Sequence, residues 1–473
     1  MVFQAGLTAG RFASPSIEQR MQAVATKIVE PAMPRNSWLR TAALPLRRVV
    51  SREAGVLLTG SCCAQLAAVL ALPVLTRLCD RESFGLFATF ASLCGVLAPL
   101  VALRYEVGML LPKSHRLAGD LFAACMGIVT VVGGSLGMIA IVVRRPLAAA
   151  LNAPGLEELV LWLSAALILT GLLSVWSQWT LRKRAFGLLR RSKIGQGVGQ
   201  ALAQIVLCVW QPTAFGLWLG QAAGQVLALV PLRCCARELK RRLQTTSWTR
   251  MRNALVRYRN FPLYSSGSVI LNVASLHAPV LLLSAFYGGE VVGGLALANV
   301  ALLAPWALLG TAFSQVYLAE ASEQLRAARP ALTKHFIATF KRLLVLGSVP
   351  LVAFVALGPW IIPLVFGRQW ESAGWYVAIL GPMYFAQFVM SPVSQTLNVL
   401  ERQGCQLGWD AARLVLVIAA LVAPSLAGYR PVVTLALYSA AMTMAYGALL
   451  FLCVAAIKDE EFRRSDCNVP GMD

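Results

Sequence analysis

The 473-residue sequence predicts an all-α membrane protein in which twelve transmembrane helices form two six-helix bundles related by pseudo-two-fold symmetry. Three observations lead to this fold class: long apolar runs without charged residues, an uneven distribution of Lys and Arg between the connections, and a motif that occurs once in each half. The composition agrees, because 58% hydrophobic residues, 13% charged residues and a mean hydropathy of +0.67 exclude an ordinary soluble enzyme.

The apolar runs predict the individual helices, because a helix needs about 20 apolar residues to cross the hydrocarbon core of a bilayer. The run over residues 194–232 is about twice that length and is interrupted at Gln211-Pro212, so it predicts two crossings. With the other runs this makes twelve. In chain order the runs cover residues 54–76, 83–103, 121–143, 159–181, 194–232, 260–289, 291–319, 343–367, 372–400, 414–429 and 431–457.

Lys and Arg are sorted between the two faces when connections are assigned to alternate sides of the membrane. One face receives 36 of the 42 basic residues. The other face receives Arg77, Arg81, Arg144, Arg145, Arg368 and Arg430. The positive-inside rule makes the rich face cytoplasmic, so we expect both termini in the cytoplasm. Omitting one crossing would mix the two groups, which supports the number twelve.

The net charge of +21 does not predict nucleic-acid binding here, because the charges lie in the cytoplasmic connections, where they act as topology signals and contact anionic lipid headgroups. The eleven Cys include no Cys-x-x-Cys and no Cys/His ligand spacing. We therefore expect no metal, no other cofactor and no disulfide framework.

The longest basic connection, residues 233–259, follows the sixth crossing and divides the chain into halves. We expect a cytoplasmic N-terminal extension over residues 1–53, a six-helix bundle over 54–232, the basic loop over 233–259, a second bundle over 260–457 and a cytoplasmic tail over 458–473. The extension has no apolar core of a cleavable signal peptide. An interfacial amphipathic helix, a disordered segment and a start codon placed too far upstream all remain open for it.

The two halves share a motif at matching positions. Pro-Val-Leu at residues 73–75 is followed by Leu-Ala-Pro at 97–99, and the same pair occurs at 279–281 and 303–305. The interval between the prolines is 26 residues in both halves. This pattern indicates an internal duplication, and because six helices is an even number the repeats should be related by an axis along the membrane normal. A substrate would then lie between the bundles, and rocking them would give alternating access.

Several segments resemble those of a known family. Pro73-Val-Leu-Thr-Arg-Leu, Phe84-Gly-Leu-Phe-Ala and Leu103-Arg-Tyr-Glu-Val in the first half, with Val365-Phe-Gly-Arg-Gln-Trp and Trp409-Asp in the second, are similar to bacterial polysaccharide flippases. These belong to the multidrug/oligosaccharidyl-lipid/polysaccharide exporter superfamily, and the resemblance covers about residues 50–458.

The resemblance implies a secondary transporter without covalent chemistry on its substrate, not an enzyme. It implies translocation of an undecaprenyl-diphosphate-linked oligosaccharide for O-antigen, capsule or exopolysaccharide synthesis. The expected partners are this lipid-linked oligosaccharide, membrane lipids, a coupling ion (H⁺ or Na⁺), and a polysaccharide polymerase with its export machinery.

Charged residues at span ends are candidates for the diphosphate, because Arg offers permanently charged, forked donors and buried charge in a membrane is costly. Arg104 and Glu106 lie where the second span meets the cytoplasm, and Asp410 and Arg413 begin the eleventh span at i, i+3 spacing. Arg104 could equally be an ordinary helix-end arginine that reaches the interface. The second pair could equally be a structural ion pair.

Other polar residues within spans are candidates for the sugar path and for ion coupling. His277 is the histidine deep within a span and is a candidate proton-coupling group; a neutral histidine bonded to a neighbouring helix is the alternative. Amides in the seventh and tenth spans could line a sugar path or bond neighbouring helices. They are Asn272, Gln387, Gln395 and Asn398, of which Asn272 and Gln395 are our candidates for substrate contact.

Two other functions remain open. A multidrug exporter of the same superfamily usually carries acidic residues in its first bundle, and the first six spans here have no deeply buried carboxylate. A membrane polysaccharide polymerase or ligase typically needs a large outside loop with active-site residues, whereas the longest outside loop here, residues 144–158, has about fifteen residues.

Overall fold

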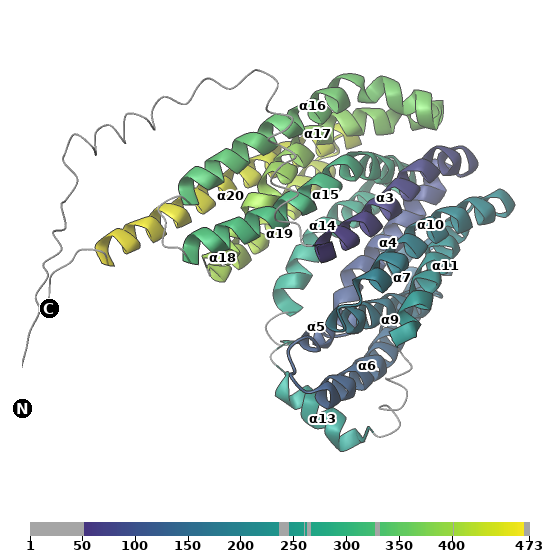
Figure 1. The fold of residues 1–473 in the computed structure, drawn as a ribbon. Coiled ribbons are helices and arrows are strands. Elements are labelled where there is room, and N and C mark those ends of the chain that lie inside the picture. The colour runs from purple at the N-terminus through teal and green to yellow at the C-terminus, as the bar shows by residue number, and fades with distance from the viewer. Residues whose placement is uncertain are drawn as a thin grey trace, which may run out of the picture. The chain divides into compact units, whose positions relative to one another are not determined.

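The computed structural model describes residues 52–235, 246–259, 261–262, 266–326, 332–400 and 402–467, and within these ranges all regular structure is helical (Figure 1). The predicted extension over residues 1–53 lies almost entirely outside the described residues, as does part of the basic loop over 233–259. The all-helical membrane fold predicted from the sequence is therefore confirmed for the part of the chain that is described.

Twelve helices of at least 19 residues occur in the described residues, one for each predicted crossing. They are α3 (Arg52–Leu78), α4 (Arg81–Val101), α6 (His115–Val142), α9 (Leu163–Arg182), α10 (Phe186–Trp210), α11 (Ala214–Leu232), α14 (Ser266–Tyr287), α15 (Gly289–Arg326), α16 (Leu332–Phe366), α17 (Glu371–Val393), α19 (Gln403–Leu426) and α20 (Pro431–Cys467). In the part of the chain that the structure describes, ten helical segments are long and apolar enough to cross a membrane, so the protein is a multi-pass membrane protein. The other two long helices are α10, whose first turns carry Arg190, Arg191 and Lys193, and α15, which has a shorter apolar segment over Gly289–Leu303.

The break predicted at Gln211-Pro212 separates α10 from α11. The backbone of Gln211 is extended, and Thr213 caps α11 by accepting a hydrogen bond from the Gly216 amide at 3.4 Å. Proline without an amide hydrogen and a threonine N-cap both favour ending one helix and starting the next at this place.

Shorter helices occupy several connections. They are α5 (Tyr105–Gly108), α7 (Arg144–Ala150), α8 (Leu156–Val160), α13 (Trp248–Arg257) and α18 (Gln395–Val399), with 3₁₀ turns η1 (Arg233–Cys235) and η3 (Arg368–Trp370). The connection over residues 144–158, expected to be a loop, is thus partly helical. α20 continues through Lys458 to Cys467, so most of the predicted tail over residues 458–473 extends the last long helix.

The long helices pack in groups that follow the two halves of the sequence. In the first half α10 packs on α3 and α11, and α6 packs on α9; in the second half α17 packs on α16 and α20, and α14 packs on α19 (Figure 1). Across the halves, α4 contacts both α14 and α15. The pseudo-two-fold relation between the halves stays a prediction.

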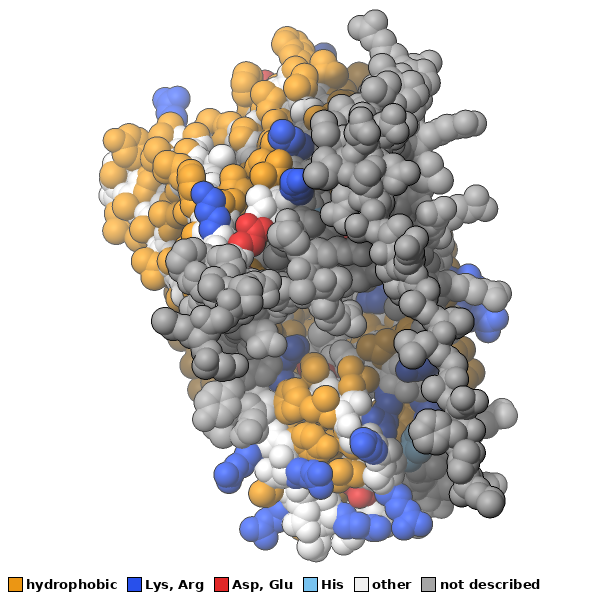
Figure 2. Space-filling view, turned by 60° about the vertical axis from the view of Figure 1, so that its left-hand side comes forward, with side chains coloured by type: hydrophobic (Ala, Val, Ile, Leu, Met, Phe, Trp, Pro, Cys, Tyr) orange, Lys and Arg blue, Asp and Glu red, His pale blue; other side chains and the backbone are white. Residues whose placement is uncertain are grey.

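The outward faces of the helices are apolar, as a lipid solvent requires. Trp210, Val142 and Leu364 are each at least 80% exposed, which a soluble protein would avoid over so many helices. Figure 2 shows hydrophobic side chains over much of the described surface, with Lys and Arg gathered at the lower end, where α13 lies. The exposed Arg250, Arg252 and Arg257 belong to this helix.

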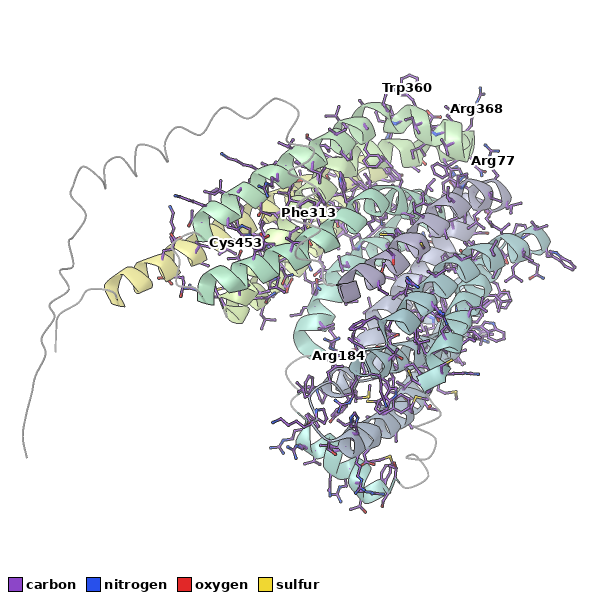
Figure 3. All side chains as sticks on the ribbon, in the orientation of Figure 1. Arg77, Arg184, Phe313, Trp360, Arg368 and Cys453 are labelled. Atoms are coloured by element: carbon purple, nitrogen blue, oxygen red, sulfur yellow. The ribbon has the colours of Figure 1, made fainter. Side chains whose placement is uncertain are left out.

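Basic residues assigned to opposite faces of the membrane lie apart. Figure 3 shows Arg77 and Arg368, both predicted outside, at the same end of their helices, with Arg184, predicted inside, away from them. Arg77 Nη2 lies 3.5 Å from the carbonyl oxygen of Val365, which joins α3 to the end of α16. The arrangement agrees with the charge sorting, and the orientation of this end toward the outside stays a prediction.

Candidate functional site: a polar cavity between the halves

A cavity of about 850 Å³ lies between the two halves of the described chain. The first half contributes residues of α3, α4, α10 and α11, and the second half contributes residues of α14, α15, α17, α19 and α20. Among the described residues, the formally charged side chains that line it are Lys193 and Arg413, both positive. The cavity therefore combines a polar wall with positive charge at a depth where the surrounding helices are apolar.

Arg413 of α19 is the most strongly held of these charges, because its side chain is only 7% exposed. Its Nη2 donates to Asn272 Oδ1 at 2.6 Å and lies 3.5 Å from Asp410 Oδ1. The guanidinium also lies over the ring of Trp409, 4.8 Å from its centroid. A buried charge needs such partners, and the carboxylate, the amide oxygen and the aromatic face together supply them.

The cluster around Arg413 keeps donors for a ligand. Its Nη2 makes the contacts to Asn272 and Asp410, including a long one of 3.5 Å to the Asn272 carbonyl, and a guanidinium has five N–H donors. Its Nε is buried and has no hydrogen-bond partner among the described residues. A guanidinium that lines a cavity and keeps an N–H without a partner is well placed to bind an anion.

His277 of α14 lines the same cavity where the two halves cross. Gly95 of α4 makes room for it, because a Cβ added at Gly95 would overlap the imidazole ring. Three predicted residues, Asn272, His277 and Arg413, are thus brought together at or beside the cavity, with Asp410 bound to the third. Their roles in substrate contact and ion coupling stay predictions.

Arg104 and Glu106 are not among the cavity-lining residues. They flank the start of α5 on a turn where Leu103 and Arg104 both have left-handed backbone, with φ of 48° and 62°. Arg104 Nη1 lies 4.0 Å from Glu106 Oε1, and Tyr105 Oη donates to the carbonyl of Leu255 in α13 at 3.3 Å. The geometry favours a structural junction between the second long helix and the basic connection.

Glu106 gives this junction a testable pH dependence. Burial raises the pKa of its carboxyl above the ordinary value, and a backbone hydrogen bond and Arg104 only partly offset this. The folded state therefore holds a proton that the unfolded state has lost, so the free energy of unfolding falls as pH rises from the ordinary carboxyl range through the raised pKa. We expect thermal unfolding in detergent to show this loss in the wild type, and Glu106→Gln to flatten it.

Glu158→Gln, at an exposed position in α8, is the control and should leave the pH dependence as in the wild type. If Glu106→Gln unfolds with the same pH dependence as the wild type, the buried carboxyl of Glu106 does not govern the pH dependence of stability.

Gln395 and Asn398 also lie away from the cavity lining. Both belong to α18, a short helix that follows α17 within the predicted tenth span. Asn398 Nδ2 donates to Gln395 Oε1 at 2.9 Å, so the two amides bond each other. Gln387, which lies within α17, does line the cavity.

Amides that the sequence interpretation did not single out form the first-half wall. Gln65 of α3 and Gln196, Gln200 and Gln204 of α10 line the cavity. The last three recur every four residues in the apolar run 194–232, and this spacing on one helix face was the available signal. Lys193 lies one turn before them and was assigned only to topology.

The halves are joined closely at the end of the helices that is predicted to face outside. A Cβ at Gly85 of α4 would overlap the carbonyl of Gly289, and one at Gly293 of α15 would overlap the carbonyl of Arg81. Arg81 Nη2 also lies 3.5 Å from Glu290 Oε2. Nearby, Trp370 Nε1 donates to the Thr76 carbonyl at 3.0 Å. The cavity is thus closed at this end, and Lys193 near the start of α10 lines it toward the opposite end.

Comparisons with known proteins agree with this architecture. A family model described as "polysaccharide biosynthesis protein" matches residues 74–374. The solved structure of the lipid II flippase MurJ in an inward closed conformation is similar, with a TM-score of 0.66 and 11% identity over 87% of this chain and 92% of that chain. Among curated proteins, none matches the chain significantly.

Two MATE transporters are similar as well. A variant of the Vibrio cholerae MATE transporter VcmN has a TM-score of 0.57 and 12% identity over 89% of this chain and 98% of that chain. An inward-facing MATE family transporter of the MOP superfamily has a TM-score of 0.55 and 11% identity over 90% of this chain and 99% of that chain. At such identities the likeness shows the fold alone.

Proposed function

The chain belongs to the polysaccharide biosynthesis protein family, within the multidrug/oligosaccharidyl-lipid/polysaccharide exporter superfamily, and we propose that it is a flippase for an undecaprenyl-diphosphate-linked oligosaccharide. It moves this lipid across the bacterial inner membrane, with both termini in the cytoplasm. The product serves the synthesis of O-antigen, capsule or exopolysaccharide. No bond of the substrate is formed or broken.

The observation that carries this proposal is the charge of the cavity. Arg413 and Lys193 are its formally charged lining residues, and no carboxylate belongs to the lining that the structure describes. An anionic diphosphate gains charge-assisted hydrogen bonds there, whereas a cation would meet two positive groups, of which Arg413 is buried. The remaining polar groups are the imidazole of His277 and a set of amides and hydroxyls, and the amides and hydroxyls suit a sugar head.

The mechanism follows from the closure of one end. The diphosphate and sugars enter the cavity from the end near Lys193, while the polyprenyl tail stays in the lipid. The contacts around Gly85, Gly293 and Arg81 then open and the opposite ends of the bundles approach, so that the cavity faces outside. Because a cavity open to one side at a time shelters the charge from hydrocarbon throughout, the bulk of the barrier to lipid flipping is removed.

Deletion of the gene tests the class of function. We expect loss of surface polysaccharide and accumulation of lipid-linked repeat units that face the cytoplasm, measured by their protection from a non-permeant glycosidase added to intact spheroplasts. Plasmid expression of the full chain should restore surface polysaccharide and remove the accumulated lipid-linked repeat units.

Other outcomes favour the alternatives. Normal surface polysaccharide with lost resistance to cationic dyes would favour a multidrug exporter, whose fold this chain shares. Altered polymer length with intact flipping would favour a polymerase.

A further inference from the structure

α10 presents an unusual wall to the cavity. Gln196, Gln200 and Gln204 recur at i, i+4 and i+8, so they lie on one face of the helix and span about 12 Å along its axis. Gln65 of the neighbouring α3 lines the cavity beside this face, and Lys193 lies one turn before it. The result is a track of amides that is longer than one sugar ring and begins at a positive charge.

The track is held on a closely packed support. α10 lies directly against α3 and α11, because a Cβ at Gly197 would overlap Ala64, and one at Gly220 or Gly224 would overlap α10 at Gln204 or Gln200. Gln204, only 6% exposed, donates from Nε2 to the Leu217 carbonyl at 2.9 Å and ties the far end of the track to α11. Small residues that bring helix backbones together leave little freedom for the wall to move independently.

The free hydrogen-bonding capacity of this wall points to a ligand. Within the described residues, the side chains of Gln65, Gln196 and Gln200 make no hydrogen bond, although each amide has two donors and an acceptor with two lone pairs. In the second half, Asn299 accepts from Tyr384 at 2.7 Å and Asn272 accepts from Arg413, whereas the side chain of Gln387 makes no hydrogen bond within the described residues. Unpaired polar groups at membrane depth are costly unless water or a ligand satisfies them.

We propose that Gln65, Gln196 and Gln200 form the sugar-recognition track, and that it takes an uncharged glycan rich in hydroxyl and acetamido groups. This rests on the proposed flippase function and adds the chemistry of the head group. Neutral amides both donate to and accept from hydroxyl and acetamido groups, and they offer no counter-charge to an acidic or amino sugar. The diphosphate charge is bound separately, by Arg413 on the opposite half and by Lys193 at the start of the track.

Two probes separate sugar recognition from binding of the lipid diphosphate. Purified full-length protein in detergent is titrated with undecaprenyl diphosphate and with undecaprenyl diphosphate that carries one N-acetylglucosamine. We expect the wild type to bind the second probe more tightly. Gln196→Ala/Gln200→Ala should weaken binding of the glycosylated probe about tenfold, as loss of two ordinary hydrogen bonds implies, and leave the bare probe unchanged.

Matched variants complete the test. Gln211→Ala, an exposed amide in the α10–α11 connection outside this cavity, should behave as the wild type, and Arg413→Ala should weaken both probes. Gln200→Asn, which keeps the amide but shortens its reach, covers the case in which the double variant does not fold. Sugar recognition by this track would be contradicted if the wild type bound both probes equally. It would also be contradicted if the glutamine variants lost affinity for both probes to the same extent. Failure of the wild type to bind either probe would instead refute the flippase function.

Discussion

Replacing Arg413 with alanine is expected to reduce export of the lipid-linked oligosaccharide by about 10- to 100-fold, since hydrogen bonds to a charged group contribute about 1.5–3 kcal/mol. The side chain lines the cavity and is held there by Asn272, Asp410 and Trp409, so its loss removes the best-oriented anion donor of the second half. Arg413→Lys should recover part of the rate, because an ammonium keeps the charge but not the forked geometry. The measurement is surface polysaccharide per cell, normalised to the amount of protein in the membrane.

Two further variants separate function from packing. Arg413→Ala leaves Asp410 as a buried carboxylate without its cation, so Arg413→Ala/Asp410→Asn should restore stability but not export. Arg430→Ala, at an exposed position beyond α19, is the matched control and should export normally. Full export by the double variant would show that Asp410 and Arg413 form only a structural ion pair, which is the alternative that the sequence left open.

Replacing Gly85 with alanine should abolish transport, because the added methyl group would overlap the Gly289 carbonyl where α4 meets α15. Backbone cannot withdraw as a flexible side chain can, so the two halves must separate at this end. The variant should therefore keep its cavity open to the predicted outside. A cysteine introduced at Gln65 in a cysteine-free background should react faster with a membrane-impermeant maleimide added outside intact cells.

The control for this variant is Gly134→Ala in α6, where a Cβ would meet nothing within 4 Å. It should leave transport and labelling unchanged. Gly293→Ala, which would overlap the Arg81 carbonyl from the other side of the same contact, should reproduce the effect of Gly85→Ala. Normal transport by both closure variants would show that this contact does not need to form during the cycle.

The helices could be predicted from the sequence because lipid leaves the backbone few alternatives. Without water, each span must satisfy its own hydrogen bonds, so an uncharged run of sufficient length becomes a helix. The long run over residues 194–232 illustrates this, since the break at Gln211-Pro212 separates α10 from α11. The short helices α5, α7 and α8 were not predicted, because their four, seven and five residues are too few to show a helical period.

The sequence indicates which polar residues lie within or beside membrane spans, but not which of them face the cavity. Asn272, His277 and Arg413 were chosen because they are polar within or beside spans, and packing brings them to the cavity or against a residue that lines it. Arg104 was chosen for the same reason, yet the turn before α5 and the contact with α13 carry it elsewhere. Which face of a helix meets the other half depends on close contacts such as Gly95 with His277, and a single sequence does not reveal these pairs.

The most direct test is transport by the purified protein in liposomes. A radiolabelled undecaprenyl-diphosphate-linked oligosaccharide is placed in both leaflets, and the fraction cleaved by an external glycosidase is followed over time. With active protein, cleavage should proceed from the outer-leaflet pool to nearly the whole pool, and with Arg413→Ala cleavage of the inner-leaflet pool should be about 10- to 100-fold slower. The decisive conditions are folded wild-type protein and an imposed H⁺ or Na⁺ gradient of either sign. If cleavage stops at the outer-leaflet pool under all of these conditions, the result contradicts transport of this lipid through the cavity.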